Sequence, residues 1–250
     1  MDASIDNLLN TMNSFFLIAL PYIALVVCII GTIWRYRQTK FKVSSLSSQF
    51  LEGRTLFWGS VPFHWGILVL FLGHLVGFVF PRGVLLWNSH PVRLIIIEIS
   101  AFIFALAVLV GLLNLIYRRL TNPKVIVVTN KMDVFILLLL LLLVVSGLWV
   151  AYFFRWGSSW FASVITPYLR SIFMLQPDIS AVSAFPWVVK LHMISAYFLV
   201  MIIPFSRLVH FLVLPLDYIW RPYQQVYWNW NRKDIRKAGS AWADKRPKNN

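Results

Sequence analysis

Apolar residues occur in five long runs along the chain, and polar residues separate them. The runs cover residues 15–34, 61–80, 94–117, 134–154 and 188–214. A helix needs roughly 20 residues to cross about 30 Å of hydrocarbon, so each run is long enough to span a membrane. A sixth run, residues 160–175, is shorter and contains Pro167 and Arg170, which favours an interfacial or loop helix. The pattern predicts an all-α integral membrane protein with five transmembrane helices.

The composition supports a membrane protein and excludes a typical water-soluble fold. Hydrophobic residues make up 59% of the chain and charged residues only 13%. Charged residues are about one quarter of an average soluble domain. The formal net charge of +14 could indicate nucleic-acid binding, but the position of the basic residues along the chain argues for membrane orientation instead.

Most basic residues lie in three segments that alternate with less basic ones. These segments follow the first, third and fifth runs: Arg35, Arg37, Lys40, Lys42, Arg54; Arg118, Arg119, Lys124, Lys131; Arg221, Arg232, Lys233, Arg236, Lys237, Lys245, Arg246, Lys248. The other loops hold Arg82, Arg93, Arg155, Arg170 and Lys190. Because basic loops stay in the cytoplasm, the N-terminus is expected outside and the C-terminus in the cytoplasm.

Two parts follow from this division: a membrane domain of residues 1–215 and a basic, Trp-rich cytoplasmic tail of residues 216–250. The tail fits either an interface belt on anionic lipid or a docking arm for a cytoplasmic subunit. Asp2 and Asp6 precede the first run, so it lacks the positive start of a cleaved signal and should be retained. Cys28 is the only cysteine, which excludes a disulfide or thiolate-bound cluster built from this chain alone.

Four histidines lie within the apolar runs, where polar side chains are costly and mark functional sites. His64 and His74 fall in the second run, and His192 and His210 in the fifth. Any one of them could merely bond a neighbouring carbonyl. The two helices are predicted to be antiparallel, which places His64 opposite His210 and His74 opposite His192. Two imidazoles from opposite sides suit the six-coordinate iron of an electron-transfer haem, so we expect two haems.

The spacing of these histidines does not match on straight helices. Ten residues separate His64 from His74, about 15 Å of rise, whereas eighteen separate His192 from His210, about 27 Å. Pro204 lies between the latter two and should kink or tilt the helix. Gly66, Gly73 and Gly77 would let a macrocycle approach the backbone, or they would serve helix packing alone.

Several stretches of the chain resemble the gamma subunit of respiratory membrane-bound nitrate reductases, the quinol-oxidising dihaem cytochrome b. The resemblance covers nearly the whole chain and is strongest in Ser-Ser-Gln-Phe-Leu (47–51), Phe-His-Trp-Gly-Ile (63–67) with Gly73-His74, Pro-Phe-Ser-Arg-Leu-Val-His (204–210) and Arg-Pro-Tyr-Gln (221–224). It implies that His64 and His210 bind the proximal haem and His74 and His192 the distal one.

The resemblance also implies partners: an iron–sulfur beta subunit, a molybdenum-containing alpha subunit and the quinone pool. Arg207, about one turn before His210, could pair with a haem propionate or extend to the inner interface. The family's quinol site lies near the distal haem at the outer face. There Arg93 could hold a quinol oxygen, or it could anchor its helix at the membrane interface. Glu98 could accept a proton from quinol, or it could stabilise a helix end. His90 fits an ordinary surface residue and Asp133 a helix N-terminus.

These observations predict a cytochrome b subunit in the cell's inner membrane, in contact with lipid and binding no nucleic acid. It would oxidise quinol and reduce cytoplasmic subunits of a nitrate reductase through two b haems. One alternative is a related cytochrome b of another respiratory complex, such as a nitrite oxidoreductase. A more distant alternative is a transporter that uses the histidines as a proton relay. The terminal substrate does not follow from this chain.

Overall fold

A computed structural model describes residues 2–39, 48 and 51–212 of the chain. Contacts divide the chain into a unit of Met1–Phe211 and a second unit of Leu212–Asn250. Because the described residues end at 212, the predicted basic tail of residues 216–250 lies outside them. In the described part all regular structure is helical.

Five helical segments of the described chain are long and apolar enough to cross a membrane, as predicted. They are Asn7–Gln38, Arg54–Val79, Pro91–Thr121, Lys131–Phe153 and Trp187–Phe205. Most extend beyond the predicted runs by a turn or more, because polar first and last turns are helical although they do not read as apolar. The second span begins at Arg54 since the Glu52 carboxylate accepts the backbone N–H groups of Thr55 and Leu56 at its start.

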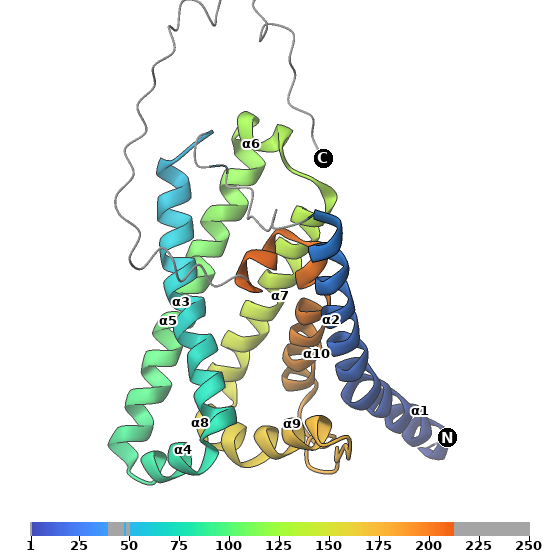
Figure 1. Cartoon of the computed structure of the whole chain (residues 1–250). Helices are drawn as coiled ribbons and strands as arrows, with labels where there is room; N and C mark the ends of the chain where they lie inside the picture. Colours follow the sequence, from blue (N-terminus) through green and yellow to red (C-terminus); the bar gives the residue numbers. More distant parts are fainter. Residues whose placement is uncertain (1, 40–47, 49–50, 213–250) are drawn as a thin grey trace, which may run out of the picture. The chain divides into compact units, whose positions relative to one another are not determined.

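The spans pack in a chain of neighbours within the first unit (Figure 1). α3 (Arg54–Val79) packs along α5 (Pro91–Thr121), which packs on α7 (Lys131–Phe153). α7 packs on α10 (Trp187–Ile202), and α10 packs on α2 (Leu20–Thr39). The α3–α5 contact is close because Gly59, Gly66 and Gly111 leave no room for a side chain at their Cα atoms.

The first span continues α1 (Asp2–Ser14) through a π-helical turn, η1 (Phe15–Ala19), into α2. A π turn shifts the backbone hydrogen bonds by one residue, and the Leu17 carbonyl within it accepts a bond from the Tyr168 hydroxyl at 2.7 Å. Leu17 is fully buried against Ile165 and Ile172. The irregular turn thus fastens the first span to the segment around Tyr168.

Residues 157–173 form short helices that lie at one end of the spans, as the sequence predicted, and not a sixth span. They are α8 (Gly157–Trp160), the π turn η2 (Phe161–Ile165) and α9 (Thr166–Phe173). Thr166 Oγ1 donates to the Gly77 carbonyl, and Arg170 Nη2 donates to those of Phe78 and Val79. α9 therefore satisfies the carbonyls at the C-terminus of α3. We call this end of the bundle the α9 end.

The opposite end, here called the basic end, is held by ion pairs. Arg118 is 4% exposed and pairs with Glu52 at 2.6 Å, and it also donates to the Ser48 hydroxyl and to two backbone carbonyls. The Thr55 N–H and the Arg118 guanidinium outweigh burial and lower the pKa of Glu52 to about 2. Asp133 pairs with both Arg119 and Arg207. These pairs connect α3, α5, α7 and the chain after α10.

The fifth span differs from the single helix that the sequence predicted. α10 ends at Ile202, and the chain continues as the 3₁₀ turns η3 (Ile203–Phe205) and η4 (Arg207–Leu212). Pro204 has no N–H to donate and its ring crowds the preceding turn, which favours a break in the α-helix at this point. His192 and His210 therefore do not share the face of one helix, and the spacing mismatch between the two histidine pairs no longer applies.

Candidate histidine site

The four singled-out histidines lie on three elements. His64 and His74 are on an exposed face of α3, and His192 is half-buried on α10. His210 is on η4, beyond the break in the fifth span. α3 and α10 run in opposite directions along the bundle (Figure 1). From their positions along these elements, His64 and His210 lie toward the basic end and His74 and His192 toward the α9 end.

Each of the four rings has its Nδ1 beside a backbone carbonyl oxygen. The bonds join His64 to Ser60 at 2.8 Å, His74 to Leu70 at 2.7 Å, His192 to Leu143 at 3.0 Å and His210 to Arg207 at 2.7 Å. A carbonyl can only accept, so Nδ1 carries the proton and Nε2 keeps its lone pair. No hydrogen bond within the described chain engages Nε2 of any of the four.

This arrangement is the usual state of a metal-binding histidine, whose second nitrogen donates to a carbonyl that fixes the ring and its tautomer. For His64 and His74 the carbonyl belongs to the residue four positions earlier on the same helix. For His192 it comes from α7, where Ser146 Oγ also lies 3.2 Å from Nδ1. All four rings are thus oriented before any ligand binds.

The rings of His64 and His210 face each other with centroids 6.3 Å apart and planes inclined by 55°. Two imidazoles that bind one metal ion from opposite sides have centroids about 6 Å apart, since each metal–nitrogen bond is about 2 Å. Phe71 on α3 also contacts Phe211 on η4, with ring centroids 5.3 Å apart. Direct ring contacts therefore bring together His64 and His210, the two residues predicted to form one pair.

No ring contact joins His74 to His192 in the described part of the chain, so this pair is brought together less closely than His64 and His210. The His74 ring is held edge-on by Phe161 of η2, with centroids 5.2 Å apart. The His192 ring lies against Gly147 of α7, where an added Cβ would stand 2.8 Å from Cε1. Any side chain at position 147 would displace this ring.

These donor sets fit b-type haem, which takes one imidazole on each side of the iron. No cluster of three or more His, Cys, Asp or Glu residues occurs in the described segments, but a bis-imidazole haem needs only two. The three singled-out glycines differ. A Cβ on Gly66 would meet Val108 and the Phe104 carbonyl of α5, and one on Gly77 would meet Phe161. A Cβ on Gly73 would meet nothing within 4 Å, so only Gly73 faces open space.

The Arg207 guanidinium points toward α7. Its Nε lies 2.8 Å from Asp133 Oδ1, and its Nη2 donates to the Val128 carbonyl. This ion pair gives Arg207 a structural contact, and its contact with a haem propionate stays a prediction. Asp133 does occupy the N-terminal turn expected of it, in a reciprocal capping box with Asn130. It also pairs with two arginines, and no local pattern in the sequence indicated these ion pairs.

The residues proposed for a quinol site lie at the α9 end. Glu98 of α5 accepts the backbone N–H groups of Gly157 and Ser158 and the Ser158 hydroxyl, so its carboxylate caps α8. Arg93 is exposed, with its guanidinium 5.3 Å from the centre of the Trp87 ring. No contact joins Arg93 to Glu98 in the described part of the chain. His90 is exposed at the start of α5.

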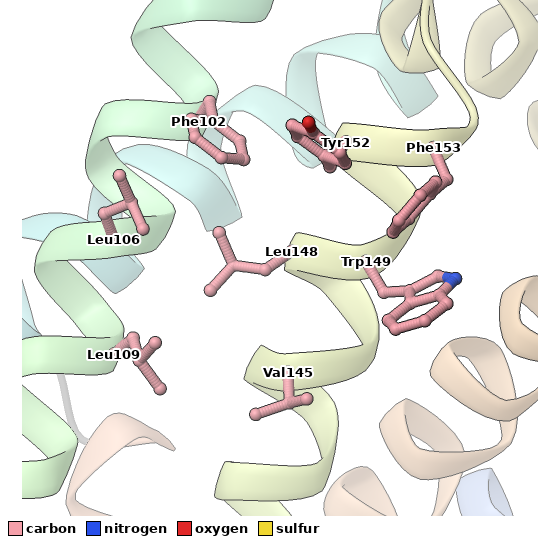
Figure 2. A pocket seen from close by; sticks show the side chains of 8 residues that line it. All are labelled: Phe102, Leu106, Leu109, Val145, Leu148, Trp149, Tyr152 and Phe153. Atoms are coloured by element: carbon pink, nitrogen blue, oxygen red, sulfur yellow. The ribbon is translucent and has the colours of Figure 1, made fainter.

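An apolar groove of about 340 Å³ opens between α5 and α7 (Figure 2). Side chains of both helices line it: Phe102, Leu106, Leu109, Val145, Leu148, Trp149, Tyr152 and Phe153. None of these lining residues is among the groups that contact His64, His74, His192 or His210 through a hydrogen bond or a ring contact in the described part of the chain. The groove is therefore separate from the histidine pairs.

Sequence reasoning missed the residues that hold the rings from other helices. These are Leu143, Ser146 and Gly147 for His192, and Phe161 for His74. The adjacent small residues Ser146 and Gly147, within an otherwise bulky apolar span, were the available signal, because small residues in membrane helices mark close approach.

Comparisons with known proteins agree with the fold. The sequence model of the nitrate reductase gamma subunit family matches residues 13–229. The nitrate reductase gamma chain of Bacillus subtilis (strain 168) is 35% identical over 209 residues, covering 82% of this chain and 93% of that protein. The respiratory nitrate reductase 2 gamma chain of Escherichia coli (strain K12) is 30% identical over 230 residues, covering 88% and 98%.

A third relative is the nitrate reductase-like protein NarX of Mycobacterium tuberculosis (strain ATCC 25618 / H37Rv). It is 31% identical over 232 residues, which cover 86% of this chain but only 34% of that longer protein. The family match spans most of the chain, and the relatives from Bacillus and Escherichia are covered almost completely. With its five membrane-span-capable helices, this chain belongs to the nitrate reductase gamma subunit family.

Proposed function

We propose that this chain is the dihaem cytochrome b subunit of a quinol-oxidising nitrate reductase. His64 and His210 would hold one b haem and His74 and His192 the other. Electrons from quinol would pass through both to an iron–sulfur subunit and then to a molybdenum-containing subunit in the cytoplasm. The observation that carries the proposal is the common state of the four rings, each with Nδ1 fixed by a carbonyl and Nε2 unengaged by the described residues.

A low-spin haem with two imidazole ligands exchanges single electrons and has no open position for substrate. The chain's own part is to orient four rings at two depths of the membrane. His64 and His210 lie toward the basic end, which the positive-inside rule assigns to the cytoplasm. This orientation makes them the pair nearer to the cytoplasmic subunits.

Quinol oxidation is proposed at the α9 end, beside His74 and His192. Quinol is apolar and enters from the bilayer, whereas its protons must leave to water, so a site near the outer face releases them outside. Arg93 would hold a quinol oxygen, and Glu98 would accept a proton. The exposed position of Arg93 supports its part in this proposal.

The test is haem quantitation on the purified complex, together with a reduced-minus-oxidised spectrum. We expect two b haems per chain. Replacing either His74 or His192 with Ala should remove one haem, and replacing both should remove no more. Replacing His64 together with His74 should remove both haems, because these residues belong to different pairs.

His90→Ala is the matched control, since His90 is exposed and belongs to neither pair. It should retain both haems. A haem content of one in the unaltered protein, or loss of both haems in the His74/His192 double variant, would contradict the pairing. A chain that binds no haem would contradict the proposed function itself.

The quinol site has a separate test. Arg93→Ala should slow haem reduction by a quinol analogue while dithionite reduction and the spectra stay unchanged. If quinol reduction survives this change but is lost on altering residues near His64, the site lies at the basic end and the assignment is wrong.

A further inference from the structure

The chain that carries His210 lacks the support of a regular helix. α10 ends at Ile202, Ser206 is extended with φ −124° and ψ 178°, and η4 is a short 3₁₀ segment. Short 3₁₀ segments have poorer hydrogen-bond geometry than α-helices. The position of His210 therefore depends on contacts from other helices.

Two arginines provide these contacts. Arg35 of α2 donates from Nη1 to the carbonyls of Pro204 and Ser206, at 2.8 and 2.9 Å. These carbonyls lie at the helix break. Arg207, at the start of η4, pairs through Nε with Asp133 Oδ1 at 2.8 Å and donates from Nη2 to the Val128 carbonyl at 3.0 Å.

Asp133 is a rigid partner for Arg207. Its side chain is 5% exposed. Oδ2 accepts the Asn130 backbone N–H at 3.1 Å and an Arg119 Nη1–H at 2.9 Å, while the Asp133 N–H donates to the Asn130 side chain. With Oδ2 held in this way, Oδ1 is directed at Arg207.

Arg207, whose side chain pairs with Asp133, also contacts the ring of His210. The Arg207 carbonyl oxygen accepts the Nδ1–H of His210 at 2.7 Å. Side chain and carbonyl of Arg207 thus connect α7 to the ring that faces His64. We propose that Asp133, acting through Arg207, is a positioning residue that sets the orientation of the His210 ring. This inference rests on the proposed role of His210 as an axial haem ligand.

Electron paramagnetic resonance of the oxidised complex tests the inference. The highest g value of a low-spin haem depends on the relative orientation of its two imidazole planes, so each pair should give its own signal. Asp133→Asn keeps the shape of the side chain and removes its charge. We expect it to shift the highest g value of the His64–His210 signal and to leave the His74–His192 signal unchanged. A His74→Ala complex, which should retain only the former signal, assigns the two.

Asp178→Asn is the matched control, because Asp178 is an exposed carboxylate in the loop that follows α9. It should leave both signals in place. Should Asp133→Asn fail to accumulate, Arg207→Lys and Arg35→Gln provide the same readout, since Lys cannot reproduce the planar fork of Arg.

Loss of a nearby charge alone would change the midpoint potential but not the g value. A protein with two haems whose g values are unchanged in all the variants that accumulate would overturn the positioning role and leave the proposed function intact. A wild-type complex without haem would instead contradict the proposed function.

Discussion

The two histidine pairs are held in different ways at the two ends of the bundle. His210 lies beyond a helix break and is fixed through ion pairs that include Asp133 and Arg207. His192 lies inside α10 and is fixed by a backbone carbonyl, the Ser146 hydroxyl and close contact with Gly147.

The difference follows from the surroundings of each pair. Charged groups cost several kcal/mol to bury, so ion pairs suit the end of the bundle where the spans leave the hydrocarbon. The contacts that hold the His192 ring are all neutral, so that ring is oriented by hydrogen bonds and by shape. A substitution that changes side-chain shape should therefore affect the His74–His192 pair most. A substitution that removes a charge should mainly affect the basic end, where His64 and His210 lie.

The largest expected effect is on the His74–His192 pair. Gly147→Val would place methyl groups where the His192 ring lies, since even a Cβ stands 2.8 Å from Cε1. We expect the haem content to fall from two to one per chain. Gly83→Val is the control, because a Cβ there meets only Phe80 at an ordinary 3.8 Å. Retention of two haems in the Gly147 variant would mean that the ring can move without losing its ligand role.

At the basic end, Glu52→Gln should lower the free energy of unfolding by about 3 kcal/mol, because it leaves Arg118 buried without its carboxylate. The folded-state pKa of Glu52 is about 2, below its ordinary value of 4.5. Its contribution is therefore complete above pH 4.5 and is lost as the pH falls toward 2. Thermal unfolding of both proteins should show a constant difference between pH 5 and 7, which shrinks below pH 4.5. A difference that grows on acidification would contradict the assignment.

Variants of Gly66 and Gly73, which lie on the same helix, distinguish contact with a haem from helix packing. Gly66→Ala should destabilise the fold by about 1–3 kcal/mol through overpacking against α5. Gly73→Leu meets no protein atom at its Cβ, so it should leave the haem-free fold unchanged and lower the haem content. Unfolding measurements and haem quantitation on both variants make the comparison. Unchanged haem content in Gly73→Leu would place the macrocycle away from Gly73.

The smallest effect is expected from Ser146→Ala. It removes one neutral hydrogen-bond partner of His192 but leaves the Leu143 carbonyl, and such a bond is worth about 1 kcal/mol. Both haems should remain, with the one at His74 and His192 released about fivefold faster in a haem-transfer assay. Release from the other pair should not change. Equal acceleration at both pairs would point to a general loosening of the fold.

The sequence predicted the number of spans because hydropathy depends only on local composition. It also could have predicted the carbonyl contacts of His64 and His74, since Ser60 and Leu70 lie four residues earlier on the same helix. The contacts of His192 with α7 and the pairing of Asp133 with Arg207 join residues far apart in the chain. They depend on how helices pack, which no local pattern encodes. Pro204 was correctly singled out, but it ends the α-helix and does not merely bend it.

The C-terminus of α3 illustrates how the last carbonyls of a membrane helix can be satisfied by protein donors. α3 has 26 residues and its neighbour α5 has 31. In hydrocarbon, each unsatisfied backbone carbonyl costs several kcal/mol, and a helix normally extends to the headgroups for that reason. Here Thr166 and Arg170 supply the donors that headgroup water would otherwise provide. α9 thus serves α3 as a local substitute for solvent at these carbonyls.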